Sequence, residues 1–281
     1  MFELNEVKIS RILNPTSIDL GEFVINPFMG CVFSCLYCYV KSNSVISKRK
    51  KPWGGFLDVR VNAPELLEKE ILVKKPEVVL LGSTTECFQP AEKEYKLTKR
   101  ILEILNKHKV YYVILSRSAL ILDYLDLLKQ GFCKRIYFTV NNFGNDFKQA
   151  LEPKSPAFNL RDEAVNKLLE NNLPVIPYFS PILPWVSDIR GIFLKFERAE
   201  AVEFECLNFR LGNIKDIVQA IAQVSPDLKV NYEKMLVDQG FYFEAWENIK
   251  KGIAIQAKSA KKEYSVYVHD FGGYFKNKYI E

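Results

Sequence analysis

Short apolar segments alternate along the chain with longer segments in which apolar residues recur every three or four positions. The short segments carry continuous runs of apolar, β-branched and aromatic residues, which is typical of strands buried on both faces of a sheet. Six such strands are expected, at residues 23–26, 78–82, 111–116, 135–140, 175–179 and 201–205. Amphipathic helices are expected between them, at residues 63–73, 94–107, 119–130 and 160–171.

The order of these elements predicts an α/β fold in which parallel strands are joined by right-handed crossovers. Six strand–helix units are too few to close an eight-stranded barrel. We therefore expect an open, partial (β/α)6 TIM-type barrel with its site at the carboxyl ends of the strands. The pattern changes after residue 210, where two helices (212–224 and 230–251) and a tail rich in lysine and aromatic residues are expected. The expected parts are an N-terminal extension (1–22), a barrel core (23–210) and a small helical, aromatic C-terminal extension (211–281).

Composition and charge narrow the class of protein only slightly. The 281 residues are 48% hydrophobic and 26% charged, with a net charge of +5, which is ordinary for a globular protein and too weakly basic for a tail-driven nucleic-acid binder. No apolar run approaches the roughly 18 residues that a membrane span requires, and residues 1–10 lack the apolar centre of a secretory signal. We expect a cytoplasmic protein that does not bind membranes and exists as a monomer or weak dimer.

Three of the six cysteines lie within eight residues, directly after the first expected strand. Cys31, Cys35 and Cys38 have the spacing C-x3-C-x2-C. Thiolates suit iron–sulfur clusters and zinc, and three of them in one loop can reach three irons of one cubane. Structural zinc normally takes four protein ligands, and no fourth cysteine lies near this run. The spacing therefore predicts a [4Fe–4S] cluster with one open iron; a zinc site completed by a distant cysteine and three inert buried thiols are the alternatives.

The chain resembles the radical S-adenosylmethionine (SAM) superfamily, and within it the spore photoproduct lyase-like, or DNA repair photolyase-like, branch. The resemblance runs from about residue 26 to residue 188, and its most specific element is Cys-x3-Cys-x-Tyr-Cys after a first strand. Weaker blocks follow in the order of the family: Gly-Ser-Thr-Thr-Glu at 82–86, Leu-Ser-Arg at 115–117, Leu-Glu-Pro at 151–153 and Pro-Ile-Leu-Pro at 181–184. The resemblance implies a metal-binding enzyme, lyase-like in its chemistry, in which SAM occupies the open iron and is cleaved reductively to a 5′-deoxyadenosyl radical.

Residues that would bind SAM follow the ends of the expected strands or belong to the matched blocks. They are Ser83, Thr84, Thr85, Arg117, Thr139, Asn141, Glu152 and Arg161. Hydroxyl and amide groups would contact the methionine or ribose of SAM, and a guanidinium would hold its carboxylate. Each also has a structural alternative, namely helix capping, turn formation or an ordinary ion pair.

Two residues are catalytic candidates. Tyr39 follows the third cysteine, a position that the resemblance places near the radical site as a hydrogen relay. Spore photoproduct lyases carry a hydrogen-donating cysteine directly before the serine that follows the second strand, whereas this chain has Gly82 there. This departure counts against reversal of thymine dimers by the same route. Cys87, a few residues further on, is the second candidate.

The sequence leaves the substrate open. Four consecutive cations, Lys48 to Lys51, the nearby Trp53 and the basic aromatic tail suggest a nucleic acid, because cations bind phosphates and aromatic rings stack on bases. A small molecule, a peptide or a protein is the alternative, with the C-terminal region as a lid. A non-catalytic iron–sulfur protein is a third reading. An enzyme of this kind needs an external electron donor of the flavodoxin or ferredoxin type.

Overall fold

The computed structural model describes residues 2–271 and 275–280, and the chain forms two compact units. The first unit comprises Met1–Phe33, Lys50–Phe138 and Asn159–Val175. The second comprises Ser34–Arg49, Thr139–Phe158 and Ile176–Glu281. The three-part division expected from the sequence, with boundaries at residues 22 and 210, stays a prediction.

A parallel sheet is the centre of the first unit. Its strands pair in the order β3, β6, β7, β8, each parallel to the next, and the short β2 joins antiparallel to β3. The bounds are β2 Asn14–Pro15, β3 Phe23–Ile25, β6 Val78–Leu81, β7 Tyr111–Ser116 and β8 Cys133–Thr139. Most of β6 and β7 is buried, as their continuous apolar sequence predicts.

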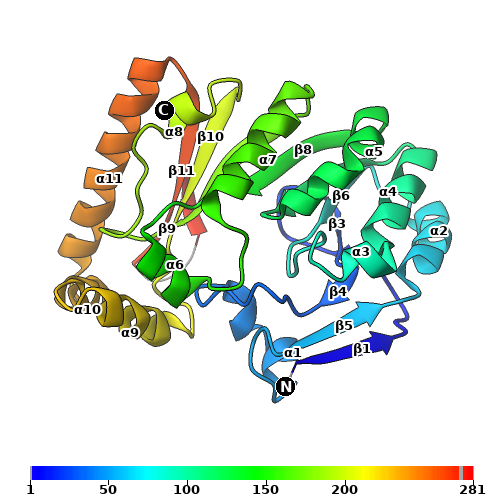
Figure 1. The fold of residues 1–281 in the computed structure, drawn as a ribbon, viewed down its shortest axis with the longest axis horizontal. Helices are drawn as coiled ribbons and strands as arrows, with labels where there is room; N and C mark the ends of the chain where they lie inside the picture. The colour runs from blue at the N-terminus through cyan, green and yellow to red at the C-terminus, as the bar shows by residue number, and fades with distance from the viewer. Residues whose placement is uncertain (1, 272–274, 281) are drawn as a thin grey trace. The chain divides into compact units, whose positions relative to one another are not determined.

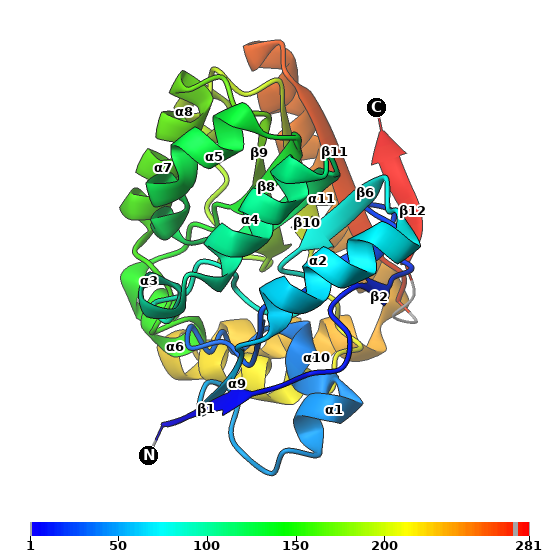
Figure 2. The same ribbon diagram turned by 90° about the vertical axis from the view of Figure 1, so that its right-hand side faces the viewer.

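Helices of the first unit follow the strands as expected, with small changes at their ends. They are α2 Ala63–Lys74, α3 Glu92–Tyr95, α4 Leu97–Lys107, the 3-10 helix η2 Ala119–Tyr124, α5 Leu125–Gln130 and α7 Phe158–Glu170. Helices α2 and α4 pack on each other, and both can be followed in Figures 1 and 2. The single helix expected at 94–107 is interrupted because Lys96 has a φ of 49°, a left-handed conformation that ends α3 before α4 begins.

A second, three-stranded sheet leads into the cysteine run. Strand β5 (Phe56–Arg60) pairs in parallel with β1 (Glu3–Val7) and antiparallel with β4 (Phe28–Met29). Figure 1 shows β1 and β5 side by side. The apolar side chains of Phe28, Leu57 and Val59 are fully buried in one cluster and fix the chain just before the first cysteine. None of these three strands was predicted from the sequence.

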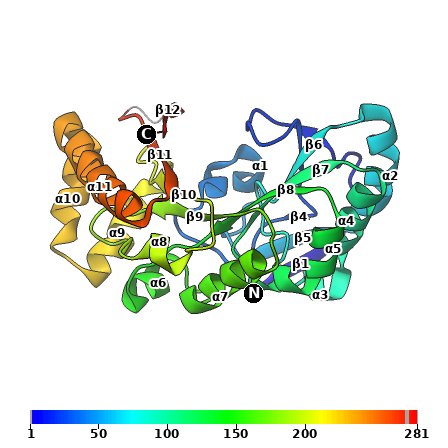
Figure 3. The ribbon, with the colours of Figure 1, turned by 90° about the horizontal axis from the view of Figure 1, so that it is seen from above.

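The second unit contains the remaining strands and a helical layer. Strands β9 (Val175–Ile182), β10 (Ala201–Cys206) and β11 (Glu263–His269) are parallel, and β12 (Phe275–Ile280) is antiparallel to β11. The helices are η1 Tyr39–Ser42, α1 Ser44–Ser47, α6 Asn145–Leu151, α8 Ile192–Lys195, α9 Ile214–Val224, α10 Leu228–Val237 and α11 Gln239–Ala260. Helix α11 packs along β11 (Figure 1), and α9 packs on α10 (Figure 3).

The α/β fold with parallel strands is confirmed, and the described strands do not close into a barrel. All six expected strands are present, with ends shifted by at most three residues. Part of the segment expected as an aromatic tail forms β11 instead, while Tyr274 lies outside the described residues. Among the helices that the structure describes, none is long and apolar enough to cross a membrane.

Candidate functional site

The cysteine loop begins with a turn that only glycine can make. Gly30 has a φ of +95°, and a Cβ atom there would lie 2.5 Å from the carbonyl oxygen of Phe56. The Thr85 hydroxyl donates to the carbonyl of Gly30 at 2.6 Å, and the amide of Val32 donates to Gln89 Oε1 at 3.1 Å. Side chains that follow β6 therefore hold the backbone on both sides of Cys31.

The rest of the loop is held within the second unit. The amide of Leu36 donates to the carbonyl of Leu151 at 2.7 Å, and Asn213 Nδ2 donates to the carbonyl of Leu36 at 2.5 Å. The amide of Cys38 donates to the carbonyl of Cys35 at 3.1 Å, which closes a tight turn between these two cysteines. Protein groups thus hold the loop backbone at several points between its first and third cysteines.

The three cysteines differ in their surroundings. Cys31 and Cys38 are half-buried, whereas Cys35 is only 6% exposed and its Sγ lies 3.2 Å from Ser155 Oγ. Across residues 2–271 and 275–280, no three His, Cys, Asp or Glu side chains surround a single metal-ion position. A cubane makes no such demand, because each thiolate binds a different iron. Soft sulfur ligands on a fixed loop fit this group, and their assignment as ligands stays a prediction.

The polar residues after β6 make hydrogen bonds that hold neighbouring segments in place. Asn26 ties two of them to β3, because its Nδ2 donates to Ser83 Oγ at 3.2 Å and its Oδ1 accepts from the amide of Thr84 at 3.1 Å. Thr85 is buried and its hydroxyl is committed to the Gly30 carbonyl, so its observed contact is structural. All three lie at the carboxyl end of β6, where the sequence placed them.

Glu86 connects this segment to the end of β7. Its buried carboxylate accepts from Ser116 Oγ at 2.8 Å, from the amide of Arg117 at 2.9 Å and from the amide of Phe88 at 3.0 Å. Burial raises the pKa of Glu86, and these donors oppose the rise. The sequence left the role of Glu86 uncertain; in the structure it positions the backbone of Arg117, a predicted SAM-binding residue.

A second polar group lies at the end of β8. Tyr37 donates a hydrogen bond to the carboxylate of Glu152, and Asn141 Nδ2 donates to the Tyr37 hydroxyl at 3.1 Å. Asn141 is fully buried, and within the described structure its Oδ1 has no hydrogen-bond partner. An acceptor left in this state fits a ligand that brings a hydroxyl or ammonium group. Thr139 is buried at the end of the same strand.

Tyr37 is the member of this group that the sequence prediction did not name, although the tyrosine of the cysteine motif was noted. Its spacing of one residue before the third cysteine is the signal that identifies it. Arg161, predicted to accompany Glu152, is fully buried on α7.

The two catalytic candidates have pKa values that keep them protonated. Desolvation of the phenol group, followed by the charges of Cys38 and Glu205, raises the pKa of Tyr39. Burial, Glu86 and Glu92 raise the pKa of the fully buried Cys87 thiol. At neutral pH both therefore carry an X–H bond.

Cys87 lies beside the position at which this chain departs from the lyase pattern. Gly82 has a φ of +84°, and a Cβ atom there would lie 2.6 Å from the carbonyl oxygen of Leu115. The sulfur of Cys87 is 3.4 Å from the same Cβ position. The backbone thus excludes a cysteine at residue 82 without rearrangement and brings another cysteine next to that place.

Comparisons with known proteins agree with the fold. The model of the radical SAM superfamily matches residues 25–190. An uncharacterized protein of Methanocaldococcus jannaschii, MJ0683, is 32% identical over 190 residues, which are 68% of this chain and 71% of that protein. The structure of spore photoproduct lyase complexed with dinucleoside spore photoproduct has a TM-score of 0.57 at 20% identity and covers 79% of this chain and 66% of that one. A mutant spore photoproduct lyase with bound AdoMet and the same dinucleoside has a TM-score of 0.58 at 16% identity, covering 84% and 80%.

Proposed function

Because the chain belongs to the radical SAM superfamily, we propose that this enzyme binds a [4Fe–4S] cluster through Cys31, Cys35 and Cys38 and uses SAM to start a radical reaction. The observation that carries the proposal is the loop itself, whose backbone is held by neighbouring groups and which carries three thiols, the soft ligands that an iron–sulfur cluster takes. When bound, the cluster supplies the electron that cleaves SAM to methionine and the 5′-deoxyadenosyl radical, which takes a hydrogen atom from the substrate.

Residues of this chain would bind and orient SAM. The unpartnered Oδ1 of Asn141 accepts a hydrogen bond from an ammonium or hydroxyl group of the cofactor. Arg117, whose backbone is positioned by Glu86, binds the methionine carboxylate through its guanidinium. Ser83 and Thr84 contribute at the end of β6.

Cys87 is the proposed hydrogen donor to a substrate radical. Its raised pKa keeps the thiol protonated, as a hydrogen-atom donor must be. The S–H bond breaks as a C–H bond forms on the substrate, which leaves a thiyl radical. One electron from an external flavodoxin- or ferredoxin-like donor and one proton then restore the thiol. Tyr39, a neutral phenol next to Cys38 in the chain, is the proposed hydrogen relay near the radical site.

The experiment that tests the proposal is anaerobic reconstitution with iron and sulfide, followed by dithionite and SAM, with 5′-deoxyadenosine measured by chromatography. Cys31→Ala, Cys35→Ala and Cys38→Ala should each abolish its formation and the absorbance of the cluster. Cys133→Ala, on β8, is the matched control and should keep both. Undiminished 5′-deoxyadenosine from any of the three loop variants would refute the assignment of the ligands.

The substrate class has two candidates. Nucleic acid is favoured by the basic run, of which Lys51 is paired with Glu3 at 2.8 Å. If it is correct, DNA or RNA binding should weaken with salt and be lost when Lys48, Arg49 and Lys50 are neutralised; binding that ignores both would exclude it. Gly82 argues against thymine-dimer reversal by the lyase route, since a cysteine there would meet the Leu115 carbonyl. A small molecule or peptide is the second candidate.

A further inference from the structure

Two neighbouring residues of the cysteine loop contact the segment at the carboxyl end of α6. The amide of Leu36 donates to the carbonyl of Leu151 at 2.7 Å, and Cys35 Sγ lies 3.2 Å from Ser155 Oγ. All four residues belong to the second unit. A backbone hydrogen bond directly beside Cys35 therefore fixes its sulfur against the Ser155 hydroxyl.

Ser155 is itself held in place. It is 6% exposed, its amide donates to the carbonyl of Glu152 at 3.1 Å, and its carbonyl accepts from Lys148 Nζ at 3.0 Å. The same Nζ donates to the carbonyl of Glu152 at 3.3 Å and lies 6.0 Å from the centre of the Phe158 ring. The backbone of Ser155 is anchored through both its amide and its carbonyl, so its hydroxyl stays close to the Cys35 sulfur.

The state of the cysteine decides which of the two atoms donates the hydrogen bond. A thiol and a hydroxyl can both donate, but a cysteine that binds iron is a thiolate and has no proton to give. The Ser155 hydroxyl must then donate to the Cys35 sulfur. Glu152 Oε2 lies 4.0 Å from the same sulfur, but an ionised carboxylate only accepts, and this one already accepts from Tyr37. Ser155 rather than Glu152 is therefore the donor to a ligating Cys35.

A hydrogen bond to a ligand sulfur stabilises negative charge on the cluster. Reduction adds one electron, so the reduced cluster is the more negative state and accepts the stronger hydrogen bond. Cys35 and Ser155 are both buried, and a low local dielectric strengthens this effect. A donor at this position therefore makes the cluster easier to reduce.

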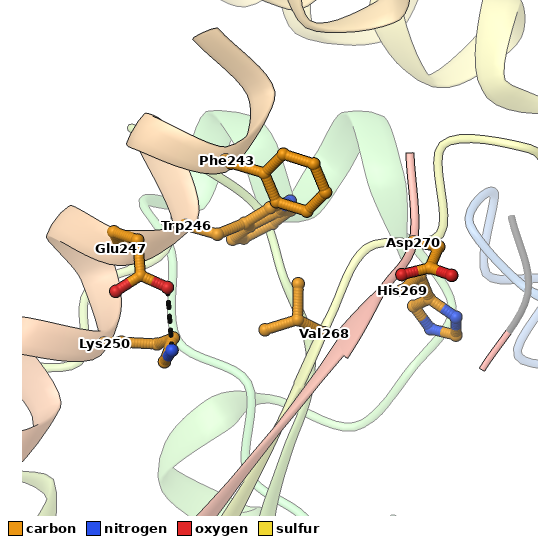
Figure 4. A pocket seen from close by; sticks show the side chains of 7 residues that line it. All are labelled: Phe243, Trp246, Glu247, Lys250, Val268, His269 and Asp270. Atoms are coloured by element: carbon orange, nitrogen blue, oxygen red, sulfur yellow. Dashed lines mark hydrogen bonds and ion pairs between the residues drawn. The ribbon is translucent and has the colours of Figure 1, made fainter. Parts of the chain in front are cut away.

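The hollow between α11 and β11 has a different chemistry. Figure 4 shows Phe243 and Trp246 on its walls, and Lys250 pairs there with Glu247 at 2.7 Å. The described residues that line this hollow include no cysteine, and its lysine and glutamate neutralise each other. It therefore gives no sign of a group that acts on the cluster.

We propose that Ser155 is a positioning residue that raises the reduction potential of the [4Fe–4S] cluster by donating its hydroxyl hydrogen to Cys35 Sγ. Ser155 thereby helps an external flavodoxin- or ferredoxin-like donor to deliver the single electron on which the proposed reaction depends. The inference rests on the proposed function, because it takes Cys35 as a ligand of the cluster.

The reduction potential is measured on the reconstituted protein without SAM, so that the result does not depend on turnover. The cluster is titrated with dithionite through redox mediators, with one electron taken up per cluster, and its absorbance and electron paramagnetic resonance are followed. Ser155→Ala should shift the reduction equilibrium about tenfold toward the oxidised state, which makes the potential of a one-electron couple about 59 mV more negative. Ser155→Thr keeps a hydroxyl and should restore most of this shift.

Ser187→Ala is the matched control, because the Ser187 hydroxyl has a structural role in the same unit, where it accepts from the Leu183 amide at 2.8 Å. It should lower the stability and leave the potential unchanged. The inference is overturned if Ser155→Ala shifts the potential no more than Ser187→Ala, or if folded Ser155→Ala and Ser155→Thr share one potential.

The iron and sulfide content of the unsubstituted protein separates this inference from the proposed function. If that protein takes up neither, the proposed function fails and the inference fails with it. A bound cluster whose potential does not respond to Ser155→Ala refutes the inference alone.

Discussion

Gly82 offers a sharp test of the geometry at the end of β6. Its φ of +84° costs an alanine about 1–2 kcal/mol, because L-residues avoid left-handed conformations. The added Cβ would also lie 2.6 Å from the Leu115 carbonyl, and this backbone atom can move only with β7. Forced shifts of this kind cost about 1–3 kcal/mol. We therefore expect Gly82→Ala to lower the free energy of unfolding by about 2–5 kcal/mol.

Two other glycines separate the terms of this estimate. Gly191 has a φ of +69° with nothing within 4 Å of its Cβ position, so Gly191→Ala should cost only the conformational term, about 1–2 kcal/mol. Gly252 is in α11 with equally open space, so Gly252→Ala should stabilise by about 0.5–1 kcal/mol. Urea titrations followed by circular dichroism measure all three. If Gly82→Ala costs no more than Gly191→Ala, the close approach of Leu115 is wrong, and with it the argument that residue 82 cannot be cysteine.

Three further predictions concern single side chains. Since the folded pKa of Glu86 lies above its usual value of 4.5, stability should fall as pH rises from about 4.5 toward the folded pKa, and Glu86→Gln should flatten this dependence in urea midpoints taken across pH; an unchanged slope would contradict it. In cluster-free protein, iodoacetamide should label half-buried Cys31 and Cys38 well before buried Cys87, as read by peptide mass spectrometry, and early labelling of Cys87 would contradict its burial. Asp238→Ala should lower the free energy of unfolding by about 1 kcal/mol in urea titration, because the carboxylate caps α11 by accepting from the Phe241 amide at 2.9 Å. An unchanged free energy of unfolding would contradict this cap.

The strands of the first unit were predictable because their apolar runs are continuous. Val-Val-Leu-Leu in β6 and Tyr-Tyr-Val-Ile-Leu in β7 leave little alternative to burial on both faces. Strand β5 escaped prediction because Asp58 interrupts its apolar pattern. In the structure Asp58 is buried and accepts a hydrogen bond from Asn5 at 3.1 Å, a partner on β1 that no local pattern reveals.

The cysteine loop was predictable from spacing, whereas the groups that hold it were not. Thr85 and Gln89 act on the backbone of the loop from more than 50 positions along the chain, and Glu86 acts on the end of β7 from about 30. Such contacts depend on which strands become neighbours. Sequence reasoning placed these residues at the right edge of the sheet, but it could not distinguish those that face a ligand from those that hold the loop.

The polar residues of β10 and β11 have a sequence signal of their own. Two carboxylates two positions apart in Val-Glu-Phe-Glu-Cys must share one face of β10, and an otherwise buried strand does not tolerate this without partners. Ser265, Tyr267 and His269 repeat the alternation on β11, which is why that segment resembled a polar tail rather than a strand. In a parallel sheet, period-two polarity on adjacent strands therefore indicates polar groups that bind one another across the strands, as Glu205 does with Tyr178, Ser180 and His269.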